Sequence, residues 1–289
     1  IELSRILREQ EHFSQAHDQL TSAANLKNSD LLIQEELGIS YLSLGEASKA
    51  LQIFEYLTEQ TPLKQSLWSY KGIALKLLGR MDEYNYLCNY DHLLIATIDI
   101  PKGFSNLKEF NKDLVNTLRD YHHAKTNPLD QSLQFGSQTS EKLFDYHAPI
   151  IQTLRQSFRE KTVEFLQQLP KDNNHPLLSR NTGNFIEADS WSVILHNSGF
   201  HKNHHHPVGW YSGPYYAQLP EIIKNKDQKQ GWVKFGQPGF KMTQKLEPDL
   251  IVQPTEGMMI RFPSYFWHGT NPFESNVERI TVPGDIIPV

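Results

Sequence analysis

The chain has 289 residues, of which 38% are hydrophobic and 21% charged, and its net charge is −5 at pH 7. A chain of this length can bury a full core and is long enough for two domains. The negative charge argues against a nucleic-acid surface, and no apolar run approaches the roughly 20 residues of a membrane-spanning helix. We therefore expect a globular protein that binds neither nucleic acid nor membrane.

Cysteine is nearly absent from the sequence. Cys88 is the single cysteine, so an intrachain disulfide and a thiolate metal site are excluded, and any metal must be held by histidine and carboxylate. The sequence also lacks a charged-then-apolar secretory leader. It begins with Ile1 rather than Met, so we expect a trimmed N-terminus. These features predict a cytoplasmic protein.

The first ninety residues repeat with a period of 34 residues. Gly38 and Gly72 are 34 positions apart, as are Gly45 and Gly79. Small and aromatic residues between them recur at the offsets of tetratricopeptide repeats, in which small residues let paired helices approach closely. We predict a tetratricopeptide α-solenoid within a first domain of residues 1–95, with repeats at residues 1–25, 31–62 and 65–90.

Such a solenoid has two interpretations. Its groove can bind a peptide or protein partner, or the repeats can only cap the next domain or form a homodimer. A groove lined by Asn, Lys and Arg would indicate peptide binding, whereas an apolar lining would indicate oligomer packing. The sequence favours neither alternative.

A second domain, residues 96–289, is predicted to begin with helical segments. Apolar residues recur at helical spacing in residues 107–125 and 141–169, and we expect these helices to support a barrel from outside. Residues 128–139, between them, are polar. We interpret them as an edge strand with a turn, or as a segment that covers the site, with Gln131 as a candidate substrate contact.

From Phe185 onward the apolar pattern changes to that of strands. Turn residues separate six predicted strands, at residues 191–195, 211–217, 232–235, 250–252, 258–262 and 279–282. Many short strands at even spacing indicate a sandwich or barrel. We therefore predict an α+β protein.

Four of the thirteen histidines fall within six consecutive positions. Residues two apart on a strand point to the same face, so His204 and His206 would aim into one space and His205 would point away. A third histidine, His268, and a basic residue, Arg279, follow far downstream. This order is typical of a mononuclear metal site in a double-stranded β-helix (jelly-roll) barrel.

Two blocks of sequence carry a family resemblance. The residues concerned are Trp191-Ser192-Val193, Gly199-Phe200-His201, Asn203-His204, His206-Pro207, Gly209-Trp210, Ser212, Tyr215-Tyr216 and Leu219-Pro220 in the first block, and Gly257, Phe262 to Thr270, Pro272-Phe273 and Glu278-Arg279 in the second. Together with the repeats and the segment Asp130 to Thr139, they resemble bacterial proteins in which tetratricopeptide repeats are fused to a 2-oxoglutarate/Fe(II) oxygenase. More distantly, the second domain is similar to prolyl hydroxylases.

The resemblance implies an Fe(II) site with 2-oxoglutarate and O2 as cosubstrates. His204, His206 and His268 would be the metal ligands, on one face of the ion. Arg279 would bind the distal carboxylate of 2-oxoglutarate in a two-pronged ion pair.

Two hydroxyl groups would complete the cosubstrate site. Thr281 lies two residues beyond Arg279 on the same strand face and would add a hydroxyl donor. In the related folds a tyrosine also binds this carboxylate, and Tyr216 is the match here, whereas Tyr215 would face the other way.

One position departs from the family pattern. The usual pair is His-x-Asp, but this chain has His206 at the second position. Three neutral imidazoles leave the iron more positively charged than two imidazoles and a carboxylate. Asp285 could instead place a carboxylate next to the ligands, and Glu187 or His201 could also take part.

Three further residues have alternative interpretations. His201 is either a substrate contact or a structural hydrogen-bonding residue. Trp210 is a candidate substrate platform, although tryptophans at such positions are more often barrel core. Arg261 is either part of a structural ion pair or an alternative to Arg279 in binding the cosubstrate.

The sequence thus predicts a 2-oxoglutarate- and Fe(II)-dependent oxygenase that hydroxylates a peptide, protein or amino-acid-like substrate. Two rivals stay open. The barrel could be a cupin-like three-histidine dioxygenase that needs no 2-oxoglutarate, or a degenerate barrel attached to a tetratricopeptide binding scaffold.

Overall fold

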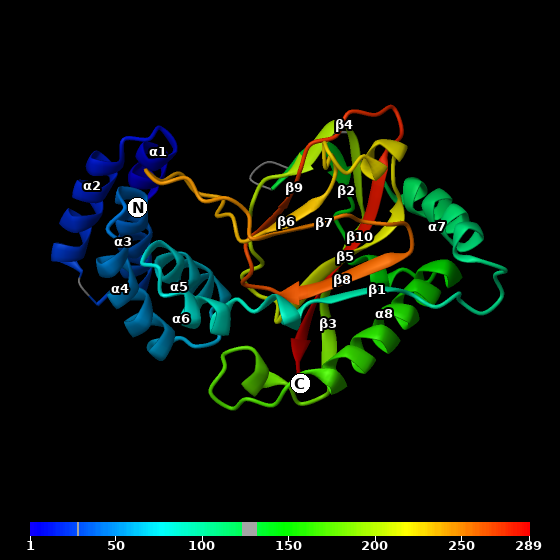
Figure 1. Ribbon diagram of the computed structural model, residues 1–289, viewed down its shortest axis with the longest axis horizontal. Coiled ribbons are helices and arrows are strands. Elements are labelled where there is room, and N and C mark those ends of the chain that lie inside the picture. Colours follow the sequence, from blue (N-terminus) through cyan, green and yellow to red (C-terminus); the bar gives the residue numbers. More distant parts are fainter. Residues whose placement is uncertain (28, 123–131) are drawn as a thin grey trace.

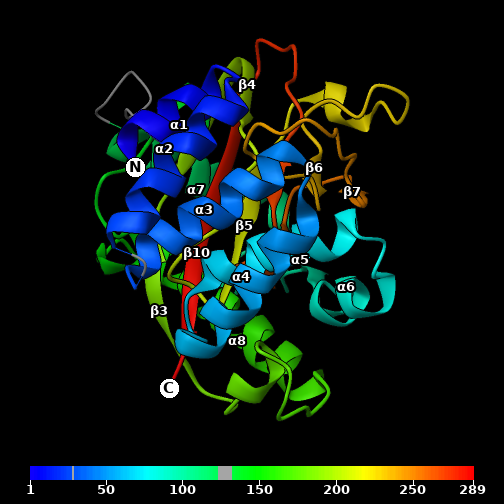
Figure 2. The same ribbon diagram turned by 90° about the vertical axis from the view of Figure 1, so that its left-hand side faces the viewer.

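The computed structural model describes residues 1–27, 29–122 and 132–289 (Figure 1). One group of helices lies at one end of the molecule and the strands lie at the other (Figure 1). Figure 2, seen from the helical end, has helices α1 to α6 in front of the strands. Among the described residues, no helix is long and apolar enough to cross a membrane. Gln131 lies outside the described residues.

The N-terminal helices follow one another as hairpins, and each helix contacts the next. Their bounds are α1 (Glu2–Glu9), α2 (Phe13–Leu26), α3 (Leu31–Leu44), α4 (Ala47–Gln60), α5 (Gln65–Leu77) and α6 (Met81–Leu87). The three pairs match the three predicted repeats, except that α2 extends one residue beyond the first, so the helical content of this part is confirmed. Their assignment to the tetratricopeptide class stays a prediction.

Two of the repeating glycines have a clear steric role. A Cβ on Gly38 would lie 2.7 Å from the Cζ of Phe54, so only glycine lets α3 approach the α4 ring this closely. Gly45 ends α3 with a φ of 81°, in the left-handed region that glycine adopts without strain. The glycine period seen in the sequence thus reflects helix packing and helix termination.

The strands form two antiparallel sheets in the described part of the chain. Their bounds are β1 (Leu94–Thr97), β2 (Leu133–Gln138), β3 (Phe185–Ser190), β4 (Val193–His201), β5 (Tyr211–Gln218), β6 (Val233–Phe235), β7 (Leu250–Val252), β8 (Met258–Pro263), β9 (His268–Thr270) and β10 (Arg279–Pro288). The larger sheet has the order β1-β8-β5-β10-β4-β2, with β3 also paired to β10, and the smaller one has the order β7-β6-β9.

All six predicted strands are present, with β4 and β10 longer than expected. The edge-strand interpretation of residues 128–139 is confirmed for its described part, because β2 lies at the end of the larger sheet. β1 pairs with β8 and spans the predicted boundary between residues 95 and 96, which stays a prediction.

Two helices, α7 (Leu107–Tyr121) and α8 (Pro149–Gln168), cover the outer face of the larger sheet (Figure 1). The predicted helix start at residue 141 is wrong. Proline is favoured in the first turn of a helix because its missing N–H is not needed there, and α8 begins at Pro149. The preceding residues form a short 3-10 turn, Leu143–Asp145.

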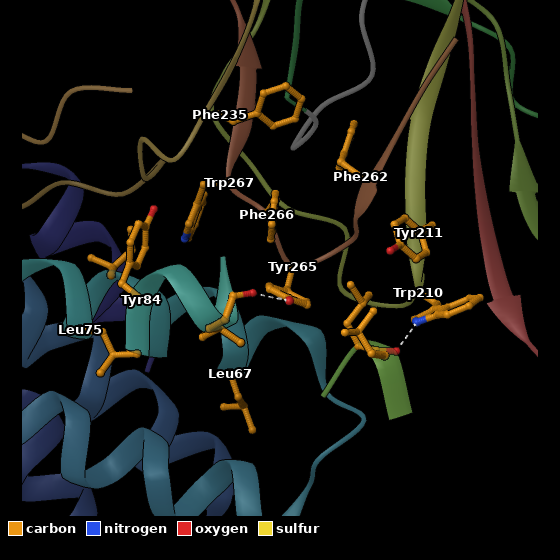
Figure 3. Packing of buried hydrophobic residues seen from close by; sticks show 14 of the residues in the cluster. Leu67, Leu75, Tyr84, Trp210, Tyr211, Phe235, Phe262, Tyr265, Phe266 and Trp267 are labelled. Carbon is orange, nitrogen blue, oxygen red and sulfur yellow. Dashed lines mark hydrogen bonds between the residues drawn. The ribbon is translucent and has the colours of Figure 1, made fainter. Parts of the chain in front are cut away.

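The segment between β8 and β9 joins the sheets to the N-terminal helices. Tyr265, Phe266 and Trp267 are buried between the two parts (Figure 3). The Ser69 hydroxyl of α5 donates to the Tyr265 carbonyl at 2.7 Å, and the Trp267 indole donates to the Ser69 carbonyl at 3.2 Å. Because His268 follows directly, this packing fixes the start of β9.

The loop between β6 and β7, residues 236–249, lies along the N-terminal helices. The Ser43 hydroxyl of α3 donates to the Lys241 carbonyl at 2.8 Å, and the Ser43 backbone carbonyl accepts the Thr243 N–H at 2.9 Å. Lys76 of α5 forms an ion pair with Asp249, with 2.6 Å between Nζ and Oδ1. The chain's own loop therefore covers part of the helical surface, which we call the β6–β7 loop contact.

Candidate metal and cosubstrate site

Three histidine side chains meet where the two sheets come together. His204 follows β4 and pairs with His268, the first residue of β9, through backbone hydrogen bonds of 2.8 and 2.9 Å. The His206 N–H donates to the carbonyl of Ser264 at 2.8 Å. One ring nitrogen of each histidine lies within 4.8 Å of the other two. The set could thus hold one metal ion.

The second nitrogen of each ring is already engaged. Nδ1 of His204 lies 2.8 Å from the Lys202 carbonyl, and Nδ1 of His268 lies 3.0 Å from the Phe266 carbonyl. Because a carbonyl can only accept, both Nδ1 atoms carry hydrogen and both Nε2 atoms carry the lone pair. This arrangement is typical of metal-binding histidines, whose outer nitrogen donates a hydrogen bond.

Burial keeps these two imidazoles neutral. It lowers the pKa of His204 and of His268 well below the usual value of 6.5, and the neighbouring histidines lower both further. Metals bind the neutral form of histidine, so protons do not compete for these nitrogens at neutral pH.

The histidines open into a cavity of about 910 Å³. Its wall also includes Arg279, Tyr216 and Thr281. Thr281 pairs with Tyr216 across β10 and β5, and the Arg279 guanidinium lies 5.1 Å from the centre of the Tyr216 ring. The predicted cosubstrate residues therefore share one cavity with the predicted metal ligands.

Arg279 is a buried cation that lacks a counter-charge. It is 2% exposed, and within the described ranges no carboxylate pairs with it, while its guanidinium and the Tyr216 hydroxyl interact with each other and Nε has no further hydrogen-bond partner. Burial raises the pKa of Tyr216 to about 12, so this hydroxyl keeps its proton and can donate. A buried, unpaired cation is unfavourable, and these two groups therefore fit a carboxylate ligand.

The residues proposed for substrate contact lie in different places. His201 lines the cavity, and its Nδ1 lies 3.2 Å from the Ser132 hydroxyl. Trp210 is completely buried, and its indole donates to the Leu177 carbonyl at 3.0 Å (Figure 3). The prediction of Trp210 as a substrate platform is therefore wrong, because the ring belongs to the core.

The His205 ring packs toward the N-terminal helices and is partly exposed. Its ring packs edge-on against Trp267 at 4.8 Å and Tyr70 of α5 at 5.8 Å. The residue between the two candidate ligands is thus fixed by the N-terminal helices.

The alternative roles of two charged residues are not supported by their positions. Glu187 forms ion pairs with Arg155 and Arg159 at 3.2 and 2.6 Å, away from the histidines. Arg261 donates to the Gly284 carbonyl at 2.7 Å and does not line the cavity. Arg261 is therefore a structural residue.

The sequence did not point to several residues of the cavity wall. The indole of Trp191 stacks over the His206 ring, with 5.9 Å between centroids and 24° between planes. Tyr121, Glu141 and Asp189 line the same cavity. Trp191 lies between β3 and β4. The sequence placed it in the predicted strand 191–195 and among the residues of the family resemblance, but gave it no role at the site.

The comparisons with known proteins agree with this site. Residues 189–285 match the model of a family described as "Putative 2OG-Fe(II) oxygenase". This range contains the three histidines and Arg279. No curated protein matches the chain.

Distant similarity to solved structures also exists. A prolyl-4-hydroxylase from Pseudomonas putida has a TM-score of 0.47 and 12% identity, over 68% of this chain and 93% of the other. A Trichoplax adhaerens prolyl hydroxylase in complex with a hypoxia-inducible-factor peptide has a TM-score of 0.47 and 10% identity, over 73% and 92%.

The family match and the histidine cluster define the class of the matched region. Residues 189–285 are similar to the 2OG-Fe(II) oxygenase family, and the three histidines that could hold a metal lie within this range. The predicted cofactors, Fe(II) and 2-oxoglutarate, are thereby confirmed at the level of this class.

Proposed function

We propose that this protein is an Fe(II)- and 2-oxoglutarate-dependent oxygenase that hydroxylates a peptide, protein or amino-acid-like substrate. One observation carries the proposal. Three imidazoles whose ring nitrogens lie close enough to hold one metal share a cavity with Arg279, a buried cation that lacks a carboxylate partner among the described residues. A metal ion would bind to the imidazoles, and a dicarboxylate would supply the negative charge that Arg279 lacks.

Each residue has a defined task in this proposal. His204, His206 and His268 hold the metal on one side, which leaves the cavity side open. Arg279 binds the distal carboxylate through parallel N–H groups, and the hydroxyls of Tyr216 and Thr281 can donate to the same group. When bound, Fe(II) and 2-oxoglutarate supply the oxidation chemistry, and the buried wall limits the access of water.

The three-histidine donor set does not by itself select this reaction. A cupin-like dioxygenase without 2-oxoglutarate would use the same imidazoles, but it would have no need of an unpaired arginine in the cavity. Arg279 therefore favours the 2-oxoglutarate reaction over this rival.

The size of the cavity is compatible with the proposed substrate class. At about 910 Å³ it lies at the upper end of the range for small-molecule pockets, so it has room for an amino-acid side chain beside the cosubstrate. Its wall offers the Trp191 ring for packing and polar groups for orientation.

We further propose that helices α1–α6 are tetratricopeptide repeats and that the two sheets form a double-stranded β-helix. The β6–β7 loop contact supports a role of the repeats in holding the oxygenase region. A protein partner or a second copy of the chain would have to bind beside this loop or displace it. This weakens the rival in which the repeats alone carry the function.

Anaerobic titration with Fe(II) and then 2-oxoglutarate tests the proposal. Chelation of iron by the 2-oxo acid produces a metal-to-ligand charge-transfer absorption band. We expect the band in the wild-type protein, its loss in His268→Ala, and a higher 2-oxoglutarate requirement in Arg279→Met. The absence of a band together with no succinate formation in air would refute the proposed function.

A further inference from the structure

The Asp285 carboxylate contacts one of the three candidate ligands. Its two oxygens lie 2.9 and 3.1 Å from Nδ1 of His206, and each of the two side chains is 13% exposed. An ionised carboxylate only accepts hydrogen bonds, so His206 donates its Nδ1–H to Asp285 and turns Nε2 toward the cavity. The outer nitrogens of His204 and His268 instead donate to backbone carbonyls.

Asp285 shares a strand with the cosubstrate residues. Arg279, Thr281 and Pro283 alternate along β10 and line the cavity. Because alternate residues of a strand face the same side, Asp285 continues this row toward His206. One strand thus reaches both the dicarboxylate end and the metal end of the cavity.

The contact between Asp285 and His206 involves the position, His206, at which this chain departs from the usual iron site. A ligand set of two histidines and one carboxylate reduces the charge of the metal centre by one unit. His206 stands where that carboxylate is usual, so the three ligands leave the full charge of a divalent metal. The missing negative charge lies one hydrogen bond further out, on Asp285.

We propose that Asp285 is a positioning residue of the metal site. It fixes the orientation of His206 and supplies, through the imidazole, the negative charge that a direct carboxylate ligand supplies elsewhere. A carboxylate that accepts the outer N–H makes the other imidazole nitrogen a stronger donor. The inference rests on the proposed function only in requiring that the three histidines bind a divalent metal.

A purely structural role for Asp285 makes a different prediction. Arg261 is a buried cation whose charge acts on Asp285, but the two side chains form no ion pair within 4.0 Å, and Arg261 is bound instead by the Gly284 and Gly213 carbonyls. If Asp285 served only to balance Arg261, its removal would lower the stability of the metal-free protein and leave metal affinity unchanged.

The test is a titration of the metal-free, full-length protein with Co(II), followed by its visible absorption spectrum. Asp285→Asn keeps the side-chain shape and should weaken Co(II) binding by about 10- to 100-fold, with an altered spectrum. Asp189→Asn is the matched control, because Asp189 pairs with Asp285 across β3 and β10 and lines the cavity without contacting the histidines. Wild-type affinity in Asp285→Asn, or an equal loss in Asp189→Asn, would overturn the proposal.

A double-mutant cycle with His206→Asp identifies the residue through which Asp285 acts. This substitution moves the carboxylate to the ligand position and leaves two carboxylates close together. Asp285→Asn should then strengthen Co(II) binding in the His206→Asp protein, the reverse of its effect in the wild type. The same loss in both backgrounds would show that Asp285 acts independently of His206. If His206→Asp binds no cobalt, the single variants decide.

The two proposals can fail separately. Co(II) affinity depends on neither 2-oxoglutarate nor turnover. A protein whose Co(II) affinity depends on Asp285 but that does not bind 2-oxoglutarate would retain the inference and lose the proposed function.

Discussion

Because Arg279 has no counter-charge, its replacement should stabilise the ligand-free protein and at the same time weaken 2-oxoglutarate binding. Arg279→Met removes a buried cation and leaves an apolar side chain of similar length. Burying an uncompensated polar group costs about 1–3 kcal/mol in protein variants, so the metal- and ligand-free variant should be more stable than the wild type by this amount. At about 2 °C per kcal/mol for a chain of this size, its Tm should rise by roughly 2–6 °C.

The same variant should lose 2-oxoglutarate. Truncating one partner of a buried charge pair costs about 2–5 kcal/mol, which is roughly 30- to 4,000-fold in Kd. In the wild type, 2-oxoglutarate at 100 times its Kd should stabilise the Mn(II)-loaded protein by about 2.7 kcal/mol. The variant should show almost none of this stabilisation while keeping its metal.

Differential scanning fluorimetry with Mn(II), with and without 2-oxoglutarate, measures both effects. Arg261→Met is the matched control. This arginine is equally buried, but its loss leaves the buried Gly284 carbonyl without the hydrogen bond that Arg261 donates, which should lower the free energy of unfolding by about 1–3 kcal/mol. We expect it to lower the Tm and to leave the response to 2-oxoglutarate intact. The reasoning is wrong if Arg279→Met also lowers the Tm and retains that response.

Three further predictions concern the metal, the pH dependence and the repeats. His268→Ala should abolish stoichiometric Co(II) binding, whereas Arg279→Met should keep it; equal behaviour of the two would contradict the division of roles. Burial lowers the pKa of His201 to about 3, below the usual value of about 6.5, so the unfolded chain binds a proton that the folded chain does not. This group should therefore lower the free energy of unfolding by about 1.4 kcal/mol for each pH unit below pH 6.5. Urea unfolding at pH 6.5 and pH 5 measures how the free energy of unfolding changes with pH, and His201→Gln should reduce this dependence by about one proton. The same pH dependence in wild type and variant would exclude His201 as its origin. Gly38→Ala should destabilise the protein by about 1–3 kcal/mol, because the new Cβ meets the Phe54 ring. Urea unfolding measures the loss, and adding Phe54→Leu to the Gly38→Ala protein should recover part of it. A Gly38→Ala protein as stable as the wild type would show that the ring can move aside.

The sequence predicted the features that depend on local periodicity. The 34-residue glycine spacing gave the helix pairs, because the glycines are needed where α3 meets α4 and where α3 ends. The strand-like apolar runs and the turn residues between them gave the strands. These features could be predicted because each depends on residues close together in the chain. The strand expected through His204 and His206 ends earlier, because β4 ends at His201, and the His205 ring is placed by its packing against Tyr70 and Trp267.

What the sequence could not predict depends on contacts between distant segments. The sequence left Trp210 between a substrate platform and the barrel core, and only the fold shows that its indole donates to the Leu177 carbonyl, 33 residues upstream. The β6–β7 loop contact and the Trp191 stack over His206 likewise arise from packing. For Asp285 the sequence allowed a role beside the ligands, but only the fold shows that it contacts His206 rather than another histidine.

The most direct test of the central claim is a crystal structure of the protein with Mn(II) and 2-oxoglutarate, with the metal located by its anomalous scattering. We predict one metal bound by Nε2 of His204, His206 and His268, with the distal carboxylate of 2-oxoglutarate on the Arg279 guanidinium. A metal bound elsewhere, or a fully occupied metal site with Arg279 still unpaired, would contradict the claim.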